Sequence, residues 1–481
     1  MTHKTRRIIF WCLLFFFAIF GPMAVFYSQG YRFDFQEREI IKIGGLSLKI
    51  KTGGAKIFIN NRFKEESGGL LYTGSFFKLL PKNYEVRVSK ENYHDWRKTL
   101  IVRPNFITDV FEIILFPQNQ TPQKLTDVDF FSFSPARNRL MTASIFGADA
   151  TSTPYLQIRI LEPNGKLIED FTPLYLKRAN FPLKILEARW FNSNEDFILK
   201  IQTNKTARWL FGVSGNKIFI DEEIKKALET ERKTTALAPI KINADDLFPH
   251  PLNQKELFFQ AGGAIYTYNP ETKSAKETNL GGIETGIFDS FLVRGTNLWW
   301  LDKTGALKKK DLNVNLIKET AKIPYFLPDI DYEFISWDNT FGVKTAELIY
   351  IYNEKKGDFI ELIRPISSAK FSPDRRKLFY LKNNNITVRY LEEVKIGDIK
   401  KEGEEDTVLS EKIKEIIWYP NSSHLILATE NAIKIAELDS RPLRNIAELA
   451  KAAPQITFYN PDNEKIYFLD GDGFLKTVSL K

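Results

Sequence analysis

A short motif recurs along most of this 481-residue chain. In its clearest copy, Ala369–Leu381 (AKFSPDRRKLFYL), a strand-like segment ends in an aromatic residue, Ser-Pro-Asp follows, and a second apolar segment begins. Proline is favoured at the second position of a type I turn and an Asp side chain can accept a hydrogen bond from the turn, so the motif predicts two antiparallel strands joined by a tight turn. The similar segments, of which the last two are weaker, are Phe131–Leu140, Trp190–Leu199, Phe248–Phe259, Trp418–Leu427, Phe458–Phe468, Phe291–Trp300 and Phe334–Val343.

The spacing of these copies predicts a ring of repeated β-sheets. The copies recur about every 40 to 50 residues with several short strands per unit, which is the signature of β-propeller blades. Counting every copy predicts eight blades over residues 118–481, with seven as the alternative count. The final unit stops after about three strands at Leu480, so Pro122–Leu125 is expected to supply its missing strand and close the ring. Third strands are expected at Ala264–Tyr268, Leu348–Tyr352 and Ile386–Tyr390.

The clearest copy also carries a family resemblance. Its Phe371-Ser-Pro-Asp374 and Lys377-Leu-Phe-Tyr380 segments resemble the blade motif of TolB-like and Trp-Asp-repeat-like propellers. The paired Gly-His and Trp-Asp dipeptides of the regular Trp-Asp-repeat family do not recur in this chain. The resemblance implies an architecture and is nearly silent on activity, because one propeller scaffold hosts many functions.

Composition agrees with a mainly β chain and limits its partners. The chain is 14% aromatic and holds 39 Phe, 22 Pro and 26 Gly, which favours strands and turns over a helical bundle. Lys and Arg number 68 against 60 Asp and Glu, so the net charge of +8 is spread thinly and no nucleic-acid partner is expected. A single cysteine, Cys12, excludes an intrachain disulfide and a cysteine-based zinc site.

The N-terminus predicts a membrane anchor. Residues 1–7 form a short basic tail, and Ile8–Tyr27 has no charged side chain. A helix of that length spans about 30 Å of hydrocarbon. The basic residues ahead of it and the aromatic residues after it predict a cytoplasmic N-terminus with the bulk of the chain outside the cytoplasm. The alternative is a cleaved signal peptide, against which the bulky Val25-Phe26-Tyr27 argues.

A small β-sandwich is expected at residues 45–116, after a polar and aromatic linker at residues 28–44. Apolar and polar residues alternate with period 2 in several short runs, and Gly53-Gly54 supplies a hairpin turn. About five strands follow from this pattern, at Leu46–Ile50, Lys56–Asn60, Tyr84–Ser89, Thr99–Val102 and Val110–Leu115. A generic immunoglobulin-like sandwich is one interpretation of the pattern.

The same stretch resembles the PEGA domain, a small sandwich of bacterial and archaeal envelope and surface proteins. Gly54-Ala55 keeps half of the family's first turn, and Leu80–Val88 (LPKNYEVRV) follows its Leu-Pro-x-Gly-x-Tyr-x-Val-x-Val strand closely. Asn60-Asn61, Asn83 and Asn92 stand where the family has turn glycines, and Asn also tolerates positive φ. The resemblance implies an extracytoplasmic module that holds the rest of the chain away from a membrane.

No catalytic, cofactor-binding or metal-binding residue can be assigned from the sequence, and the ligand-binding residues are unknown. Gly212-Val-Ser-Gly215 lacks a full nucleophile elbow, and Asp470-Gly-Asp-Gly473 is better explained as a hairpin turn than as a calcium loop. Trp299-Trp300 is expected to pack between blades rather than line a sugar or peptide site. The four His residues, which are expected in different modules and far apart, are His3, His94, His250 and His424.

Two charged segments interrupt the β pattern. Asp221–Lys233 is helix-prone, with Ile224 and Leu228 at helical spacing, and Glu392–Glu411 carries many charges of both signs. Both are expected to be solvated insertions on the propeller surface, with a docking site as the alternative.

These patterns together predict a non-catalytic, single-pass binding or scaffold protein of the cell envelope. The PEGA-like sandwich would be its stalk, and the propeller would engage an envelope protein, peptide or polysaccharide. The main alternative is a propeller enzyme that acts on envelope glycans through funnel carboxylates. A sensor that signals through the helix is a further alternative, although only seven residues precede that helix.

Overall fold

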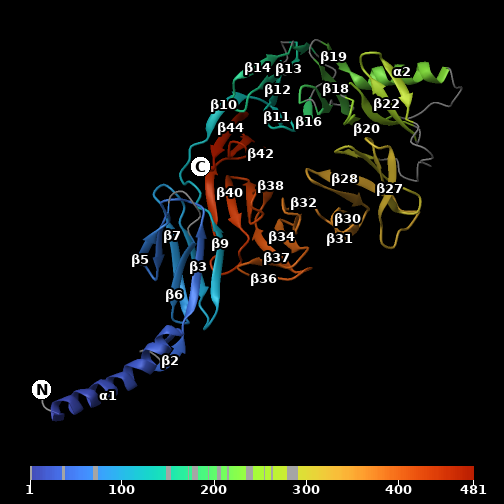
Figure 1. Ribbon diagram of the computed structural model, residues 1–481. Helices are drawn as coiled ribbons and strands as arrows, with labels where there is room; N and C mark the ends of the chain where they lie inside the picture. Colours follow the sequence, from blue (N-terminus) through green and yellow to red (C-terminus); the bar gives the residue numbers. More distant parts are fainter. Residues whose placement is uncertain are drawn as a thin grey trace.

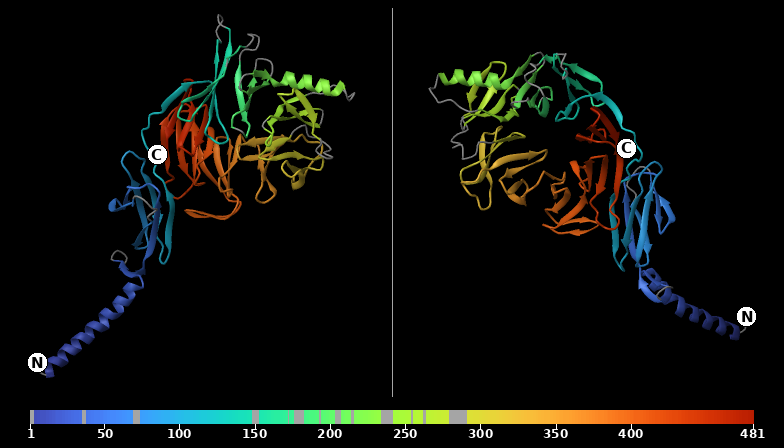
Figure 2. Two further views of the ribbon diagram at one scale, coloured as in Figure 1. Left: turned by 45° about the horizontal axis from the view of Figure 1, so that its top comes forward. Right: turned by 180° about the vertical axis from the view of Figure 1, so that it is seen from behind.

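The computed structural model is an elongated, mainly β molecule with one helix at its N-terminal end (Figure 1). The chain passes from this helix through a short hairpin and a β-sandwich into a β-propeller (Figures 1 and 2). The residues that the structure describes are 3–34, 38–68, 74–147, 153–171, 173–175, 183–192, 194–202, 207–213, 216–233, 242–253, 255–261, 264–278 and 291–481.

Helix α1 (His3–Ser28) projects away from the rest of the molecule (Figure 2). Its segment Lys4–Ser28 is long and apolar enough to span a membrane or to act as a signal sequence, and none of its most apolar stretch is buried inside the protein. Side chains that are apolar on all sides of a helix need an apolar surrounding, which the protein itself does not supply here.

The expected linker is partly a hairpin. Strands β1 (Tyr31–Asp34) and β2 (Glu39–Lys42) pair antiparallel immediately after the helix. The hairpin packs on the helix end, where the rings of Phe26 and Tyr31 meet edge to face with centroids 5.5 Å apart. The connection between helix and sandwich is therefore short and structured.

Seven strands form the sandwich, which is more than the five expected. One sheet has the order β6-β3-β9 and the other has the order β5-β4-β7-β8, and β3 pairs in parallel with β9. Strands β5 and β6 were missing from the sequence-based prediction. The bounds are β3 (Gly44–Ile50), β4 (Lys56–Ile59), β5 (Arg62–Glu66), β6 (Gly74–Leu79), β7 (Asn83–Ser89), β8 (Trp96–Ile101) and β9 (Ile107–Ile113).

Period-2 alternation fills the sandwich core. Leu48, Ile57, Val88 and Leu100 are fully buried in one apolar cluster between the two sheets. The proposed tolerance of Asn in turns is confirmed at Asn60, Asn61 and Asn92, whose φ values are 49°, 60° and 63°. It is wrong for Asn83, which begins the extended strand β7.

The propeller has eight blades in the described part of the chain, each a sheet of at least four strands. The prediction of eight blades is thus confirmed over seven. Blade 1 comprises β11 (Phe130–Phe133), β12 (Leu140–Phe146), β13 (Tyr155–Leu161), β14 (Leu167–Asp170) and β15 (Leu174–Tyr175), and blade 2 comprises β16 (Lys184–Trp190), β17 (Phe197–Gln202), β18 (Ala207–Val213) and β19 (Asn216–Phe219). Blade 3 comprises β20 (Ile242–Pro249), β21 (Leu257–Ala261), β22 (Ala264–Asn269) and β23 (Ser274–Glu277), and blade 4 comprises β24 (Leu292–Arg294), β25 (Asn297–Leu301), β26 (Ala306–Asp311) and β27 (Leu316–Lys322).

Blades 5 to 8 complete the ring. Blade 5 comprises β28 (Glu333–Trp337), β29 (Thr340–Lys344), β30 (Leu348–Asn353) and β31 (Asp358–Ile363), and blade 6 comprises β32 (Ser368–Phe371), β33 (Lys377–Lys382), β34 (Asn385–Tyr390) and β37 (Glu405–Ser410). Blade 7 comprises β38 (Ile413–Trp418), β39 (His424–Thr429), β40 (Ala432–Glu437) and β41 (Ile446–Lys451), and blade 8 comprises β42 (Ile456–Asn460), β43 (Lys465–Leu469), β44 (Phe474–Ser479) and β10 (Gln123–Asp127). Strand β10 pairs antiparallel with β44, so the expected closure by an N-terminal strand is confirmed, with its bounds shifted by a few residues.

Every copy of the repeated motif is the hairpin between the first and second strands of one blade. In the clearest copy, the Asp374 carboxylate accepts a hydrogen bond from the Arg376 backbone N–H at 3.1 Å and pairs with Lys377 at 2.8 Å. First strands of neighbouring blades contact each other, as β16 does with β20 and β38 with β42. The motif's first strand therefore lines the axis of the ring.

Both charged insertions contain regular secondary structure. The second, at residues 392–411, is not a solvated loop, because part of it contacts the sandwich. Helix α2 (Ile220–Lys233) buries Ile224 and Leu228 against blades 2 and 3, as the helical spacing indicates. Residues 394–400 form a hairpin of β35 (Val394–Ile396) and β36 (Asp398–Lys400) that reaches the sandwich. There Lys395 pairs with Asp109 of β9 at 2.8 Å and lies over the Phe111 ring.

A buried charge network joins the sandwich to blade 7. The side chain of Lys98 on β8 is fully buried, and its ammonium group pairs with Glu437 at the end of β40. The same ammonium donates to the backbone carbonyls of Asp439 and Arg441, each at 3.1 Å. Buried ammonium groups need such partners because water is excluded.

Further contacts continue this joint along the edge of β8. The Thr99 N–H donates to the Pro442 carbonyl at 2.7 Å. Asn445 bonds the Arg97 backbone twice, accepting from its N–H at 2.9 Å and donating to its carbonyl at 3.1 Å. The loop after β40 thus covers a strand edge that would otherwise be exposed, which is how natural sheets avoid pairing with other chains.

Candidate functional site: a cavity in the propeller channel

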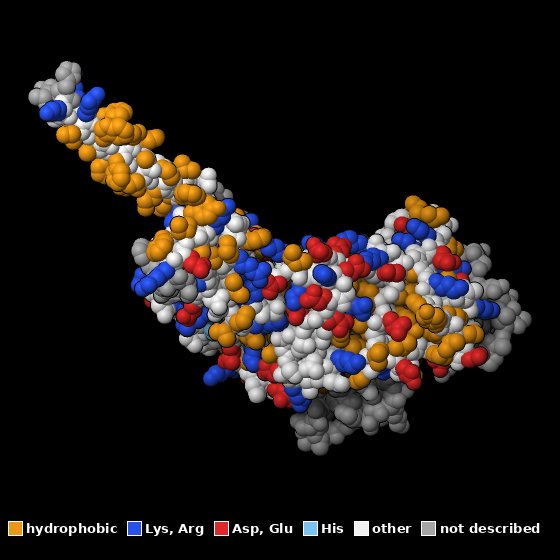
Figure 3. All heavy atoms as spheres, turned by 90° about the horizontal axis from the view of Figure 1, so that it is seen from below, with side chains coloured by type: hydrophobic (Ala, Val, Ile, Leu, Met, Phe, Trp, Pro, Cys, Tyr) orange, Lys and Arg blue, Asp and Glu red, His pale blue; other side chains and the backbone are white. Residues whose placement is uncertain are grey.

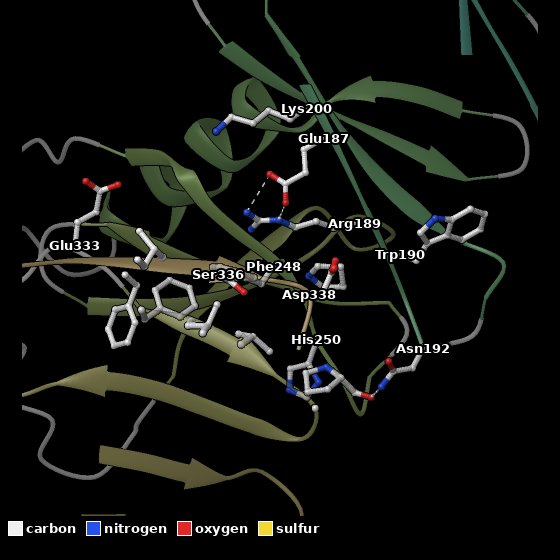
Figure 4. Close-up of a pocket in the computed structure, with 18 residues that line it drawn as sticks. Glu187, Arg189, Trp190, Asn192, Lys200, Phe248, His250, Glu333, Ser336 and Asp338 are labelled. Atoms are coloured by element: carbon white, nitrogen blue, oxygen red, sulfur yellow. Dashed lines mark hydrogen bonds and ion pairs between the residues drawn. The ribbon is translucent and has the colours of Figure 1, made fainter. Parts of the chain in front are cut away.

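A cavity of about 890 Å³ lies beside the propeller axis, between blades 2 and 5. First strands β16, β20, β24 and β28 and the segments next to them supply most of its walls, and Lys200 of the second strand β17 adds to them. Its labelled polar side chains come from several blades and surround one space (Figure 4). The lining residues used below are Glu187, Arg189, Phe248, His250, Glu333, Ser336 and Asp338.

Arg189 is held rigidly on one wall. Its guanidinium group makes two hydrogen bonds to the Glu187 carboxylate, at 2.6 and 3.2 Å, and donates to the Leu247 carbonyl at 2.7 Å. The same group lies 4.2 Å from the centre of the Phe248 ring and 4.9 Å from that of Trp209. A two-point contact combined with stacking fixes the plane of the guanidinium.

His250 is a neutral donor at the cavity wall. Its Nδ1 accepts hydrogen bonds from the backbone N–H groups of Leu252 and Asn253, at 3.2 and 2.9 Å, and its ring stacks on Phe258. Burial lowers the pKa of this imidazole below its usual value. With Nδ1 occupied as an acceptor, the proton of the neutral ring resides on Nε2.

The carboxylates that line the cavity are each paired with a cation. Besides the Glu187–Arg189 pair, Asp338 pairs with Lys370 at 2.6 Å, and Glu333 pairs with Lys344 at 3.0 Å. In each pair the carboxylate oxygens accept the contact from the cation, so these side chains offer hydrogen-bond acceptors to the cavity.

One buried carboxyl group lies elsewhere on the axis. Burial raises the pKa of Glu415 on β38, while the positive charge of Lys370 opposes this rise. One oxygen of Glu415 accepts a hydrogen bond from the Thr457 backbone N–H at 2.8 Å, which ties blade 7 to blade 8. The group is accounted for by this structural contact.

Two of the four His residues, expected to be far apart, lie at the same joint between sandwich and propeller. His94 and His424 line one small cavity of about 80 Å³. The His94 ring nitrogen Nε2 bonds the Glu448 carbonyl at 2.8 Å, and the His424 ring meets Phe116 edge to face. Within the described residues, no group of three or more His, Cys, Asp or Glu side chains is arranged to hold a metal ion.

The remaining motifs have structural roles. Trp299 and Trp300 are buried, at 1% and 6% exposure, and Trp299 packs on Phe341 and Tyr352, so the packing interpretation is confirmed. In the turn at residues 470–473, the Asp470 and Asp472 carboxylates both bind Lys476, each at 2.6 Å. Ser214 and Gly215 of the incomplete nucleophile elbow lie outside the described residues.

None of the cavity residues was singled out from the sequence as a site, although a signal was present. Arg189 and Lys370 each stand immediately before the aromatic residue of their motif copy. That position lies on the first strand of a blade, which the structure shows to line the axis. A charged residue is unusual at a position where a repeat normally has a packed side chain. It therefore indicates a position that faces the channel.

Comparisons with known proteins are limited to structural likeness. No protein-family model matches the chain, and no curated protein matches it. Among solved structures, the C-terminal WD40 domain of Sif2 is 12% identical with a TM-score of 0.39, covering 75% of this chain and 99% of that domain. The Cps50 (Swd1) β-propeller domain of Myceliophteria thermophila is 8% identical with a TM-score of 0.39, covering 76% of this chain and 100% of that domain. A chain of the mitotic checkpoint complex is 9% identical with a TM-score of 0.36, covering 76% of this chain and 96% of that one.

Proposed function

We propose that this protein is a membrane-anchored binding platform of the cell envelope, with α1 as a single-pass anchor, the PEGA-like sandwich as a stalk and the propeller as the binding module. The observation that carries the proposal is the buried joint between sandwich and propeller. A flexible tether would need no such network. A fixed joint next to an exposed apolar helix keeps the ring in one orientation relative to the anchor.

The channel cavity is the proposed binding site, and its chemistry suits an extended polar chain. His250 supplies a donor, Asp338 supplies an acceptor, and Phe248 supplies an apolar face. Peptides and polysaccharides offer such alternating polar and apolar groups, and concave sites with a few fixed polar groups bind them well. The glycan-hydrolase alternative is less well supported because each carboxylate that lines the cavity is ion-paired.

Site-specific photo-crosslinking in living cells tests this proposal. A photoreactive amino acid at Ser336 would lie in the cavity, and the same amino acid at the exposed Lys318 on outer strand β27 is the control. We expect a discrete adduct from position 336 in the membrane fraction and none of that mass from position 318. The proposal is wrong if both positions give the same adducts, or if position 336 gives none.

A further inference from the structure

The end of the sandwich nearest the helix is a continuous structural unit with the helix terminus. The Ile43 N–H donates to the Gly30 carbonyl at 3.0 Å, and the Asn105 N–H donates to the Ile43 carbonyl at 3.2 Å. The Gly45 N–H then donates to the Phe106 carbonyl at 2.9 Å. Two successive hydrogen bonds therefore connect the helix end to the loop between β8 and β9. We call this region, residues 31–34, 38–43, 78–82 and 101–107, the basal surface.

Apolar side chains are exposed across the basal surface. Ile40 is 68% exposed and Phe106 is 66% exposed, although the backbone around both is hydrogen-bonded in strands and turns. Figure 3, seen from below, shows apolar side chains gathered where the helix meets the sandwich, with Lys and Arg side chains around them. The exposed apolar residues of this surface are Phe33, Ile40, Ile101, Phe106 and Ile107.

The charges of the basal surface are predominantly positive. Its described cations are Arg32, Arg38, Lys42, Lys78, Lys82 and Arg103, and its described acids are Asp34, which is buried, and Glu39. Arg32 bonds the Tyr27 carbonyl at 2.7 Å and lies over the Tyr27 ring, so it caps the C-terminal end of α1. Aromatic and cationic side chains together are typical of the water–membrane interface, where phosphates and acyl chains meet.

The connection between α1 and β1 is too short to hold the basal surface away from a bilayer that α1 crosses. Only Gln29 and Gly30 separate the helix end at Ser28 from β1. Consecutive Cα atoms are about 3.8 Å apart, and the headgroup layer on each side of the hydrocarbon core is roughly 5–8 Å thick. The hairpin β1–β2 must then begin inside or directly against that layer.

We propose that the basal surface binds the headgroup layer of the leaflet from which α1 emerges, with Phe106, Ile107 and Ile40 inserted among the lipids and the surrounding cations on lipid phosphates. The inference rests on the proposed function, because it takes α1 as a membrane anchor. It adds a second contact with the same membrane. Two contacts, one spanning and one peripheral, fix the tilt of the sandwich and with it the height and direction of the ring.

Depth-dependent fluorescence quenching of the full chain tests the inference. In a Cys12→Ser background, the Phe106→Cys variant carries an environment-sensitive label on the basal surface. The control, Glu91→Cys, carries the same label in the exposed turn after β7, at the opposite end of the sandwich from Ile101. Both are reconstituted into vesicles of phosphatidylcholine and phosphatidylglycerol.

We expect lipids spin-labelled near the headgroup to quench the label at 106 severalfold more strongly than the label at 91, and aqueous iodide to show the reverse order. Changing Lys82 and Arg103 to Glu in the Phe106→Cys chain should reduce the lipid quenching. Equal quenching at both positions would overturn the inference.

A third label distinguishes a failure of this inference from a failure of the proposed membrane anchor. The wild-type chain, labelled at its single Cys12 inside α1, should be quenched by lipids that carry the spin label deep in the acyl chain. Deep quenching at Cys12 without shallow quenching at 106 would overturn the basal contact and leave the anchored platform standing. Absence of quenching at both positions would overturn both proposals.

Discussion

Lys98 is the residue on which the joint between sandwich and propeller depends. Its side chain is fully buried, and it connects β8 with residues more than 300 positions away, at Glu437 and in the loop that follows β40. Trp96 and Asn445 add hydrogen bonds to the same Glu437 carboxylate, at 3.0 and 2.8 Å. Removing one partner of such a group leaves an uncompensated buried charge, which costs more than an exposed ion pair contributes.

Replacing the buried lysine should therefore destabilise the whole molecule. We expect Lys98→Met to lower the free energy of unfolding by about 3–5 kcal/mol, because Glu437 would remain buried without its cation. The control is Lys395→Met, which breaks the partly exposed pair with Asp109 and should cost about 0–1 kcal/mol. Denaturant unfolding of the purified chain in detergent measures both; equal losses in the two variants would contradict this role of Lys98.

His424 should make the stability of the joint depend on pH. Burial, with smaller contributions from the charges of Lys51 and Lys98, lowers its pKa to about 3. The folded state then binds fewer protons than the unfolded state between pH 6.5, the ordinary pKa of histidine, and about 3. The stabilisation is complete above pH 6.5 and is lost as the pH falls, by up to about 1.4 kcal/mol per pH unit.

Unfolding at pH 7.5 and pH 5 would measure this effect. The loss of stability between the two pH values should be smaller in His424→Gln than in the wild type, since the variant has no imidazole to protonate. Other titrating groups are common to both proteins and cancel in the comparison. An identical pH dependence in the two proteins would show that His424 is not the group responsible.

At the scale of elements, the inserted hairpin β35–β36 connects blade 6 to the sandwich. Gly397 lies at its tip with φ at 71°, and a β-carbon there would come within 2.4 Å of Asp439 Oδ1 and 2.5 Å of Arg441 Nε. Both neighbours belong to the loop that covers the edge of β8. A side chain at the tip would therefore force the Asp439 and Arg441 side chains to shift.

Two glycine substitutions test this packing. Gly397→Ala and Gly403→Ala both impose a side chain at positive φ, at 71° and 81°, but a β-carbon at Gly403 would have no neighbour within 4 Å. We expect both to cost roughly 1 kcal/mol of backbone strain. Only Gly397→Ala should also increase protease cleavage between sandwich and propeller, as judged by gel electrophoresis of fragments. Equal cleavage in both variants would mean that the tip contact does not hold the joint.

The elements that could be predicted from the sequence are those with a local physical cause. Each motif copy encodes its own turn, as Asp374 does in blade 6, so even the two weak copies identified real blades. Helix α2 was visible from the spacing of Ile224 and Leu228. Strands β5 and β6 were missed because they are edge strands of their sheets, and in β5, where every residue is exposed, apolar and polar residues do not alternate.

The joint and the channel cavity could not be predicted because they depend on tertiary contacts. Nothing in the neighbourhood of Lys98 indicates that a carboxylate 339 residues away will neutralise it. The hairpin β35–β36 was interpreted as a solvated insertion for the same reason, since the charges of Lys395 and Asp109 become complementary only in the folded molecule. A local sequence pattern predicts that a helix or strand exists, whereas the element that it packs against depends on the whole fold.

At the scale of the whole molecule, the sandwich, the inserted hairpin and blade 7 fasten a closed ring to a short connection from an apolar helix (Figure 1). Such an arrangement keeps the channel cavity at one height and direction relative to the helix. That property is useful to a protein that presents a binding site from a membrane, and it is the basis of the proposed function.

Protease accessibility of the C-terminal propeller tests the central claim most directly. Intact cells, spheroplasts and detergent-dissolved membranes would be treated with protease and probed for the C-terminus of the full chain. We predict digestion once the envelope is opened and while the inner membrane is still intact, because basic residues ahead of a membrane-spanning helix favour a cytoplasmic N-terminus and the proposal therefore places the propeller on the other side. Protection of the propeller until detergent is added would contradict the account, since the ring would then lie in the cytoplasm.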